Sequence, residues 1–401
     1  MTVTQRRISL AVPLAAALLL ADQASAQVEE VGRFARTIKP YAQIAYTYDS
    51  NLIRLPGEEE ALILLGDEAL SDTFATYEFG IDATWERGVN TFELSGKGYS
   101  NVYNRFSGID YAGGNALAEW AWDTGLWNGL LRYRYNRGLR DFANQVIPRK
   151  DLRTRNAFVG QLGRRLGQNM GLTFRAEVAD IFYTENRFLD QERILGGVAF
   201  DWYSRAGNSI GFDVELIDGA FDNNPLNDYT QIDAGPTMRW VISGKTRINA
   251  KVGYSSREHA QSPERDFDGF TGRVDVDWRT GGDSKALFSV FREISNLSDE
   301  IANFAIIHGV SIEPTWQIST RTALRLQLAY EDRDFQGDDG VIIPQPDDRR
   351  DKVASGGIWV EWTTEGAWTF SLGAYGEDRS SNRDFANYDF LAAEGFVRFG
   401  F

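Results

Sequence analysis

One repeating pattern dominates the sequence: stretches of alternating apolar and polar residues are joined, in turn, by short turns and by longer polar loops. The stretch 73–86, for example, carries apolar residues at the odd positions from Tyr77 to Trp85 and mostly polar residues at the even positions. Because successive side chains of a β-strand point to opposite faces, each stretch has one apolar and one polar face. A soluble sandwich would rarely carry charges on strand after strand of this length. The pattern therefore predicts a transmembrane barrel with its apolar face outward and its polar face inward.

We expect an all-β, antiparallel up-and-down barrel of about eighteen strands, with sixteen as the alternative. An even number of strands places both termini on the periplasmic side. Residues 38–401 would form this single barrel. The strands are expected at 38–48, 73–86, a stretch around 92–102, 111–123, 127–137, 152–165, 170–182, 191–203, 209–218, 229–242, 247–257, 269–279, 286–294, 303–316, 321–332, 352–363, 367–378 and 387–401.

The connections differ in length, which supports this topology. Short turns rich in Gly, Asn, Asp and Ser are expected on the periplasmic side. The longer loops 49–71, 138–150, 219–228, 258–268, 295–302 and 333–351 are expected outside the cell. Tryptophans lie beside the short turns, as an interfacial girdle requires. They are Trp85, Trp122, Trp202, Trp240, Trp278, Trp316, Trp362 and Trp368.

The two ends of the chain carry targeting patterns. Arg6 and Arg7 precede an apolar run at 8–20, and small residues at 24–26 predict cleavage after Ala26. Residues 1–26 would be a signal peptide, and 27–37 a periplasmic segment. These features favour the bacterial outer membrane, in which the chain would cross many times. By resemblance to outer-membrane proteins in general, the alternating last strand is expected to carry the signal for the barrel insertion machinery, at Val397, Phe399 and Phe401.

The composition restricts the chemistry. The chain has no Cys, two His and a net charge of −15, which removes thiolate metal sites and disfavours nucleic acid as a partner. We expect no metal and no cofactor. His308 falls on the apolar face of its strand and His259 in an external loop, so neither suits a Ser–His enzyme. A glycosidase with two carboxylates in the lumen stays an alternative, but the leading expectation is a protein without enzymatic activity.

The inward positions give the candidate site. Opposite charges there can pair between neighbouring strands, or aromatic and polar groups can form a track for a carbohydrate. Arg132, Arg134, Arg153 and Arg155 lie on adjacent strands and could form a basic ladder. The residues predicted to line the pore are Glu78, Asp82, Lys97, Tyr99, Tyr103, Glu119, Arg132, Arg134, Arg153, Arg155, Arg175, Glu177, Asp213, Arg239, Arg273, Arg325, Trp359 and Tyr375.

The run from Pro40 to Pro56 contains Tyr-Thr-Tyr-Asp-Ser-Asn-Leu-Ile-Arg-Leu-Pro at 46–56. This run resembles the opening of the EpsL-like barrels of exopolysaccharide biosynthesis operons, also called putative β-barrel porins. The resemblance implies a barrel of sixteen to eighteen strands that secretes polysaccharide across the outer membrane. It also implies two partners, a periplasmic polysaccharide-export protein and an inner-membrane co-polymerase. It brings no catalytic residues.

Three functions remain open at this stage. The leading expectation is a porin that exports a secreted polysaccharide through an aqueous polar lumen. The alternatives are a general or solute-specific diffusion porin for uptake and, less favoured, a barrel enzyme. An inward-folded constriction loop would favour uptake, and the segments 51–71 and 333–351 are candidates for gating the pore.

Overall fold

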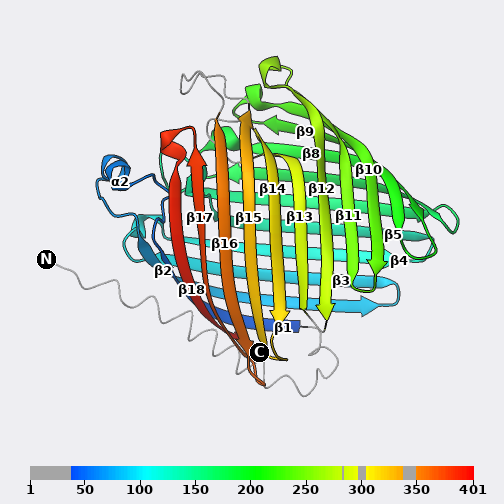
Figure 1. Cartoon of the computed structure of the whole chain (residues 1–401), viewed down its shortest axis with the longest axis horizontal. Helices are drawn as coiled ribbons and strands as arrows, with labels where there is room; N and C mark the ends of the chain where they lie inside the picture. Colours follow the sequence, from blue (N-terminus) through cyan, green and yellow to red (C-terminus); the bar gives the residue numbers. More distant parts are fainter. Residues whose placement is uncertain (1–37, 282–283, 297–303, 337–348) are drawn as a thin grey trace.

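The computed structural model describes residues 38–281, 284–296, 304–336 and 349–401. Within these ranges, eighteen strands form one antiparallel sheet, which closes through the pairing of β1 with β18 from Tyr41↔Gly400 to Asp49↔Ala392 (Figure 1). The predicted all-β barrel and its number of strands are confirmed. The expected signal peptide, the segment 27–37 and most of the loop 333–351 lie outside the described residues.

The strands follow one another around the barrel in chain order. They are β1 (Ile38–Asp49), β2 (Asp72–Arg87), β3 (Asn90–Tyr103), β4 (Tyr111–Asp123), β5 (Trp127–Leu139), β6 (Leu152–Arg165), β7 (Met170–Tyr183), β8 (Gln191–Tyr203), β9 (Ser209–Phe221), β10 (Tyr229–Ser243), β11 (Thr246–Glu258), β12 (Phe267–Gly281), β13 (Ser284–Ser295), β14 (Phe304–Gln317), β15 (Thr322–Gln336), β16 (Arg350–Thr363), β17 (Trp368–Ser381) and β18 (Tyr388–Gly400).

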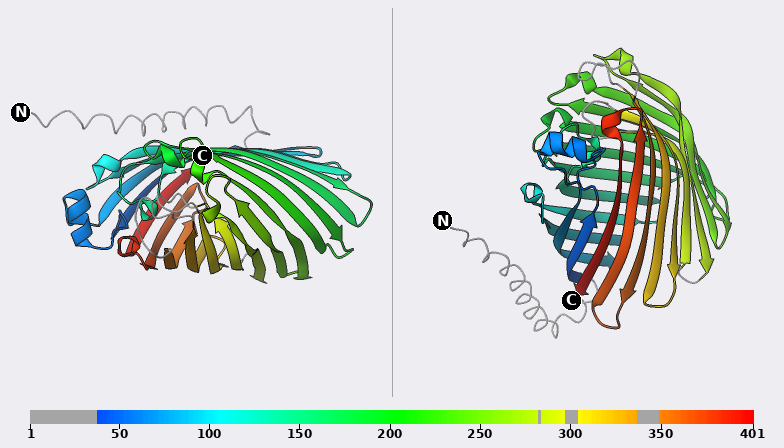
Figure 2. Two further views of the ribbon diagram at one scale, coloured as in Figure 1. Left: turned by 90° about the horizontal axis from the view of Figure 1, so that it is seen from above. Right: turned by 60° about the vertical axis from the view of Figure 1, so that its left-hand side comes forward.

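The strands are steeply tilted, as closure of a large barrel requires. In Figure 1 the strands of the near wall, such as β14 and β16, cross those of the far wall, such as β3 and β4, at a large angle. The two further views in Figure 2 show the same two walls enclosing an interior. The chain leaves β18 beside the start of β1, so β1 begins and β18 ends at the end of the barrel that also carries the short turns.

Side chains alternate strictly between the two faces of the sheet. On one face, charged residues pair between neighbouring strands, as in Glu119 with Arg132 on β4 and β5. The other face presents exposed apolar residues, among them Val198 and Val214, which are 42% and 40% exposed. The first face is the lumen wall and the second is the lipid-facing wall. The tryptophans beside the short turns all have the lipid-facing parity, and Trp85 and Trp202 are about half exposed.

Tight hairpins close one end of the barrel. Gly88, Gly125, Gly167 and Gly207 lie in these turns with φ values of 60°, 83°, 89° and 79°. Such left-handed backbone costs a residue with a Cβ atom more than it costs glycine. The glycines predicted in the short turns therefore adopt the left-handed backbone that tight hairpins need.

Four connections at the opposite end share a closing device that the sequence did not reveal. A 3₁₀ turn follows the strand, and an Asp then accepts a hydrogen bond from the backbone N–H of the residue seven positions earlier. This bond fixes the rim of the barrel locally. The pairs are Tyr103 with Asp110 (2.8 Å), Tyr183 with Asp190 (2.7 Å), Phe221 with Asp228 (2.6 Å) and His259 with Asp266 (2.7 Å).

The first long loop contains the helix α2 (Glu58–Leu65), which ends at Gly66 with φ 73°. The segment 51–71, a candidate for gating the pore, therefore contains a short helix. Ala61 is the buried residue of this helix, and it packs in an apolar cluster with Leu52 and Leu55. Among the described residues, no helix combines the length and the apolar character that a membrane crossing needs.

Candidate functional site

The structure places all the residues predicted to line the pore on the lumen-facing side of their strands, and it pairs many of them. Opposite charges meet between strands, as one of the two interpretations proposed. A role in transport stays a prediction for each residue. The lumen pairs include Lys97 with Glu78 (2.9 Å), Arg155 with Glu177 (2.7 Å), Arg273 with Glu293 (2.8 Å), and Arg132 with Glu119 (2.5 Å).

The densest pairing lies on β7, β9 and β11. Lys251 donates to Asp213 (2.8 Å) and to Glu215 (2.7 Å), and Arg175 forms ion pairs with the same two carboxylates. Two cations thus neutralise two carboxylates, so this four-residue cluster carries no net charge.

Aromatic residues occupy a separate part of the lumen wall. Trp359 and Tyr375 stack with ring centroids 6.1 Å apart, and Gly357 and Gly373 leave room for the indole. A Cβ atom on Gly373 would lie 2.1 Å from the Trp359 ring. Tyr99 donates its hydroxyl to the carbonyl of Arg137 (3.1 Å), whereas Tyr103 packs into the apolar cluster at the mouth. The predicted aromatic residues therefore do not form one continuous track.

The run Asp49–Pro56 folds into a compact turn at the mouth. The Asp49 carboxylate accepts from the Asn51 backbone N–H (2.9 Å) and from the Arg54 guanidinium (2.8 and 2.9 Å). The Asn51 amide bonds Leu55 through both its oxygen (3.1 Å) and its nitrogen (2.8 Å), and it donates to the Asp389 carbonyl on β18 (3.0 Å). Arg54 has φ 60°.

This turn buries apolar residues in the mouth. Leu52, Ile53 and Leu55 pack with Ala61 of α2 and with Phe142 of the loop between β5 and β6. The motif on which the resemblance depends thus builds the mouth of the barrel, and it has no catalytic geometry. Two loops distant in sequence, 50–71 and 140–151, share one apolar core there.

The loop 140–151 turns inward and reaches the opposite side of the mouth. Arg379 on β17 donates to the carbonyl of Ala143 (2.8 Å), although β18, β1, β2, β3 and β4 lie between β17 and β5 in the sheet. Arg379 is fixed by an ion pair with Asp351 on β16, and Asp351 also accepts from Arg349 (3.0 Å). We call Arg349, Asp351, Arg379 and Ala143 the mouth latch. The side chains of Asp351 and Arg379 are fully buried.

A cavity of about 260 Å³ opens in the lumen-facing wall of β6–β11 and β13. Four arginines line it, namely Arg153, Arg155, Arg193 and Arg257, and the described part of the lining contains no carboxylate. Arg153 and Arg155 belong to the predicted basic ladder. Arg132 of that ladder is paired with Glu119 and lies outside the cavity lining. Arg134 also lies outside that lining.

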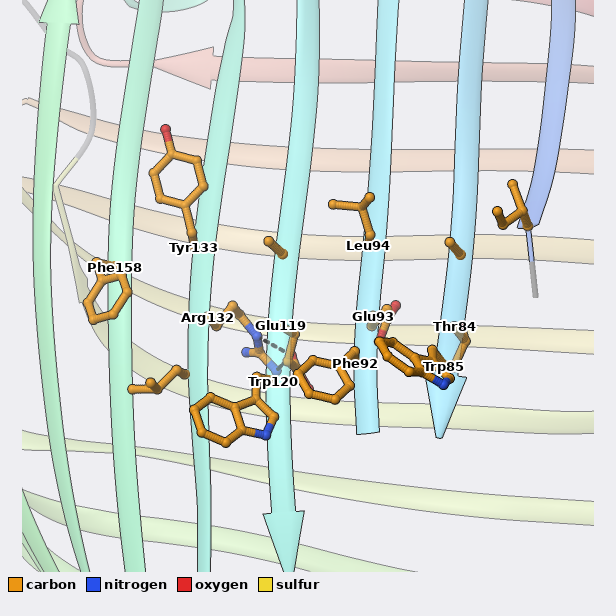
Figure 3. A pocket seen from close by; sticks show the side chains of 14 residues that line it. Thr84, Trp85, Phe92, Glu93, Leu94, Glu119, Trp120, Arg132, Tyr133 and Phe158 are labelled. Carbon is orange, nitrogen blue, oxygen red and sulfur yellow. Dashed lines mark hydrogen bonds and ion pairs between the residues drawn. The ribbon is translucent and has the colours of Figure 1, made fainter. Parts of the chain in front are cut away.

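A larger groove, of about 760 Å³, lies on the outer wall and not in the lumen. Trp85, Phe92 and Trp120 line it, and Figure 3 shows their rings on the near side of the strands, with the Arg132–Glu119 pair behind. Because this wall faces lipid, the groove is a place for acyl chains. It does not contribute to the lumen site.

The two histidines lie on the elements that the sequence predicted, but His259 is buried there and not solvated. His308 lies on the lipid-facing side of β14, where Arg292 donates to its Nε2 (3.3 Å). His259 lies in the loop after β11, 1% exposed, stacked on Phe304 at 6.0 Å. Burial lowers the pKa of His259 to about 4, and the nearby Arg257 acts in the same direction. The described residues contain no group of three or more His, Asp or Glu side chains that could hold a metal ion.

Some residues of the cavity and the latch were not singled out from the sequence. Arg193, Arg257 and Asp351 have the lumen parity of their strands, so the alternation alone could have placed them. Arg257 and Asp351 lie at or near a strand end, where the pattern merges with the loop. Val397, Phe399 and Phe401 lie at the end of the last strand, where the Phe399 ring packs on Trp368 at 4.7 Å. Their role in insertion stays a prediction.

Comparisons with known proteins find similar solved structures. They include the outer membrane protein OpdK of Pseudomonas aeruginosa (9% identity, 91% of this chain and 99% of that chain covered, TM-score 0.45). OccAB3 of Acinetobacter baumannii matches at 9% identity, with 91% and 99% covered and a TM-score of 0.46. OccK2 (OpdF) of Pseudomonas aeruginosa, in complex with glucuronate, matches at 9% identity, with 91% and 97% covered and a TM-score of 0.48.

No family model matches the chain, and no curated protein matches it. The comparisons therefore do not support the EpsL-like association, which still depends on residues 40–56 alone. At these levels of similarity, the assignment of the barrel depends on the closed sheet of this chain itself.

Proposed function

We propose that this protein is a solute-selective diffusion porin of the bacterial outer membrane, that is, the uptake alternative. In a closed barrel every strand is hydrogen-bonded on both edges, so no backbone N–H or C=O group of an edge strand is left in lipid. The outer wall is apolar with tryptophans at one end, as a lipid environment requires. The lumen wall is polar and lined by ion pairs, which suits a water-filled path. Transport is then passive, and selectivity comes from the lining charges and the width of the mouth.

The observation that carries this proposal is the inward course of the loop 140–151. The mouth latch holds Ala143 against β17, and Phe142 is buried with Leu52 and Leu55. A constriction built from buried contacts selects by size and charge. A polysaccharide chain would need a wide continuous opening, and therefore this loop would have to be displaced.

Polysaccharide export is accordingly the less favoured function. The two partners that the resemblance implies, a periplasmic polysaccharide-export protein and an inner-membrane co-polymerase, are less favoured for the same reason. Those partners would be needed to push a polymer through the barrel, whereas a diffusion porin needs neither.

The test is permeation through refolded protein. In proteoliposomes, arabinose should enter through the barrel, and planar bilayers should show single-channel currents that a long dextran leaves unchanged. Bilayers without current, together with liposomes that exclude arabinose, would overturn the porin proposal. Currents blocked by long oligosaccharides but not by small solutes would favour export.

A further inference from the structure

The arginine-lined cavity is rich in hydrogen-bond donors that have no acceptor. The side chains of Arg153 and Arg193 form no hydrogen bond or ion pair with any described residue. The Nε atoms of Arg153, Arg155 and Arg193 are buried without an acceptor, as is one terminal nitrogen of Arg257. A buried donor without a partner costs free energy, so these N–H groups are poised for an acceptor that enters from the lumen.

Two acceptors beside the cavity are already occupied by its arginines. Glu177 pairs with Arg155 at 2.7 Å. The Gln231 side-chain oxygen accepts twice from Arg257, at 2.9 and 2.6 Å. Gln231 is held in this orientation because its amide nitrogen donates to both oxygens of Asp233, at 2.9 and 2.8 Å. These acceptors leave Arg153 and Arg193 uncompensated, and the cavity lining keeps a net positive charge.

Tyr229 adds another donor. Its hydroxyl oxygen accepts from the amide of Asn296 (2.8 Å) and from that of Gln191 (3.4 Å). Because both contacts use the lone pairs of the oxygen, the hydroxyl proton remains available to the cavity. Gly219 makes room for this ring, since a Cβ atom there would lie 2.3 Å from it.

The rest of the lining is apolar. Ile181, Ile217, Phe221 and Ile294 contribute to the cavity, and Ile217 and Phe221 pack with Tyr229 as a buried cluster. A ligand would therefore meet a cationic, donor-rich part and an apolar part. A fully hydrated inorganic anion has no apolar group that could contact the isoleucine and phenylalanine side chains of the lining.

We propose that this cavity binds a small organic carboxylate with an apolar body, and that this is the solute class for which the porin selects. The proposal rests on the proposed function above. A guanidinium presents N–H groups in a planar fork that matches a carboxylate, and such charge-assisted bonds are stronger than neutral ones. The cavity volume of about 260 Å³ limits the ligand to a small molecule and excludes a polymer segment.

Benzoate is a suitable probe because it combines a carboxylate with a compact apolar ring. We expect isothermal titration of the folded barrel in detergent to show benzoate binding, and benzyl alcohol of the same size not to bind measurably. Inorganic phosphate tests whether the site takes any oxyanion. Equal or tighter binding of phosphate would overturn the assignment to an organic carboxylate.

The variants Arg153→Gln and Arg193→Gln remove donors that have no partner among the described residues, so they should fold normally. Each should weaken benzoate binding about tenfold or more, as loss of a hydrogen bond to a charged group does. Arg239→Gln is the matched control: Arg239 faces the lumen on β10 outside the cavity lining, and the change in charge is the same. Equal affinity in both cavity variants, or an equal loss in the control, would overturn the proposal.

The two proposals fail separately. Arabinose permeation without benzoate binding would remove the carboxylate site and leave the porin. Benzoate binding without permeation of any solute would remove the porin function and leave the binding site.

Discussion

The mouth latch gives the sharpest test of the constriction. Asp351 is fully buried and compensates two guanidinium groups, those of Arg379 and Arg349, whose side chains are 0% and 6% exposed. Asp351→Asn keeps the shape of the side chain but removes its charge. Two buried cations then lack a counter-ion, and breaking a buried pair in this way costs about 3–5 kcal/mol.

That cost falls mainly on the closed position of the loop 140–151, because Arg379 also holds the carbonyl of Ala143. At 1.4 kcal/mol for each factor of ten, the ratio of closed to open loop should fall by roughly 10²- to 10³-fold. We expect a higher single-channel conductance, with more current noise, in planar bilayers. Trypsin should also cleave faster after Arg149 and Lys150 in the released loop.

The control is Glu365→Gln. It makes the same chemical change in the exposed pair of Arg321 with Glu365, where the Glu365 side chain is 81% exposed. Exposed pairs contribute little to stability, so this variant should behave like the parent protein. The reasoning would be refuted if Asp351→Asn left both the conductance and the rate of trypsin cleavage unchanged in a correctly folded barrel.

Three further predictions concern the turn at the mouth, the lipid-facing wall and a buried histidine. Asn51→Ala removes three hydrogen bonds of a buried side chain, two to Leu55 and one to Asp389, and should destabilise the turn locally by about 1–3 kcal/mol, read as faster amide exchange in 49–56. Val214→Arg, on the lipid-facing side, should lower the stability of the barrel in liposomes by about 2–4 kcal/mol, whereas Gln327→Arg, on the lumen side of β15, should change it little in the same urea titration. Burial lowers the pKa of His259 to about 4 from an ordinary value near 6.5, so the unfolded loop binds a proton first. The stability of the loop 259–266 should therefore fall by roughly 3 kcal/mol as the pH drops from about 6.5 to 4, and amide exchange should show this in the parent but not in His259→Gln.

The strands could be predicted because the information that specifies them is local. Alternation over ten or more residues, with a glycine at a turn such as Gly125 or Gly167, sets both the face and the register of a hairpin. The constriction could not be predicted in this way. Arg379 and Ala143 are 236 positions apart, and no periodicity connects them.

The lumen shows an intermediate case. The alternation of side chains along the strand placed Arg153 and Arg155 inward. It could not predict that Arg155 would form an ion pair with Glu177 while the Arg153 side chain has no partner among the described residues. Which charges pair depends on the register between neighbouring strands and on the length of each side chain. Sequence reasoning therefore found the wall and missed the cavity in it.

A net charge of −15, taken over the whole chain, disfavours the binding of anions. Charges more than about 8 Å apart are largely screened at physiological salt, so a bound solute responds to its immediate surroundings. In the cavity those surroundings are four arginines, and the carboxylate of Glu177 beside them is held by Arg155. Other acidic residues of the lumen are paired with their own cations, as Asp213 and Glu215 are with Lys251 and Arg175. An acidic chain can thus present a basic site, because pairing along the wall is uneven and leaves its unpaired cations in one place.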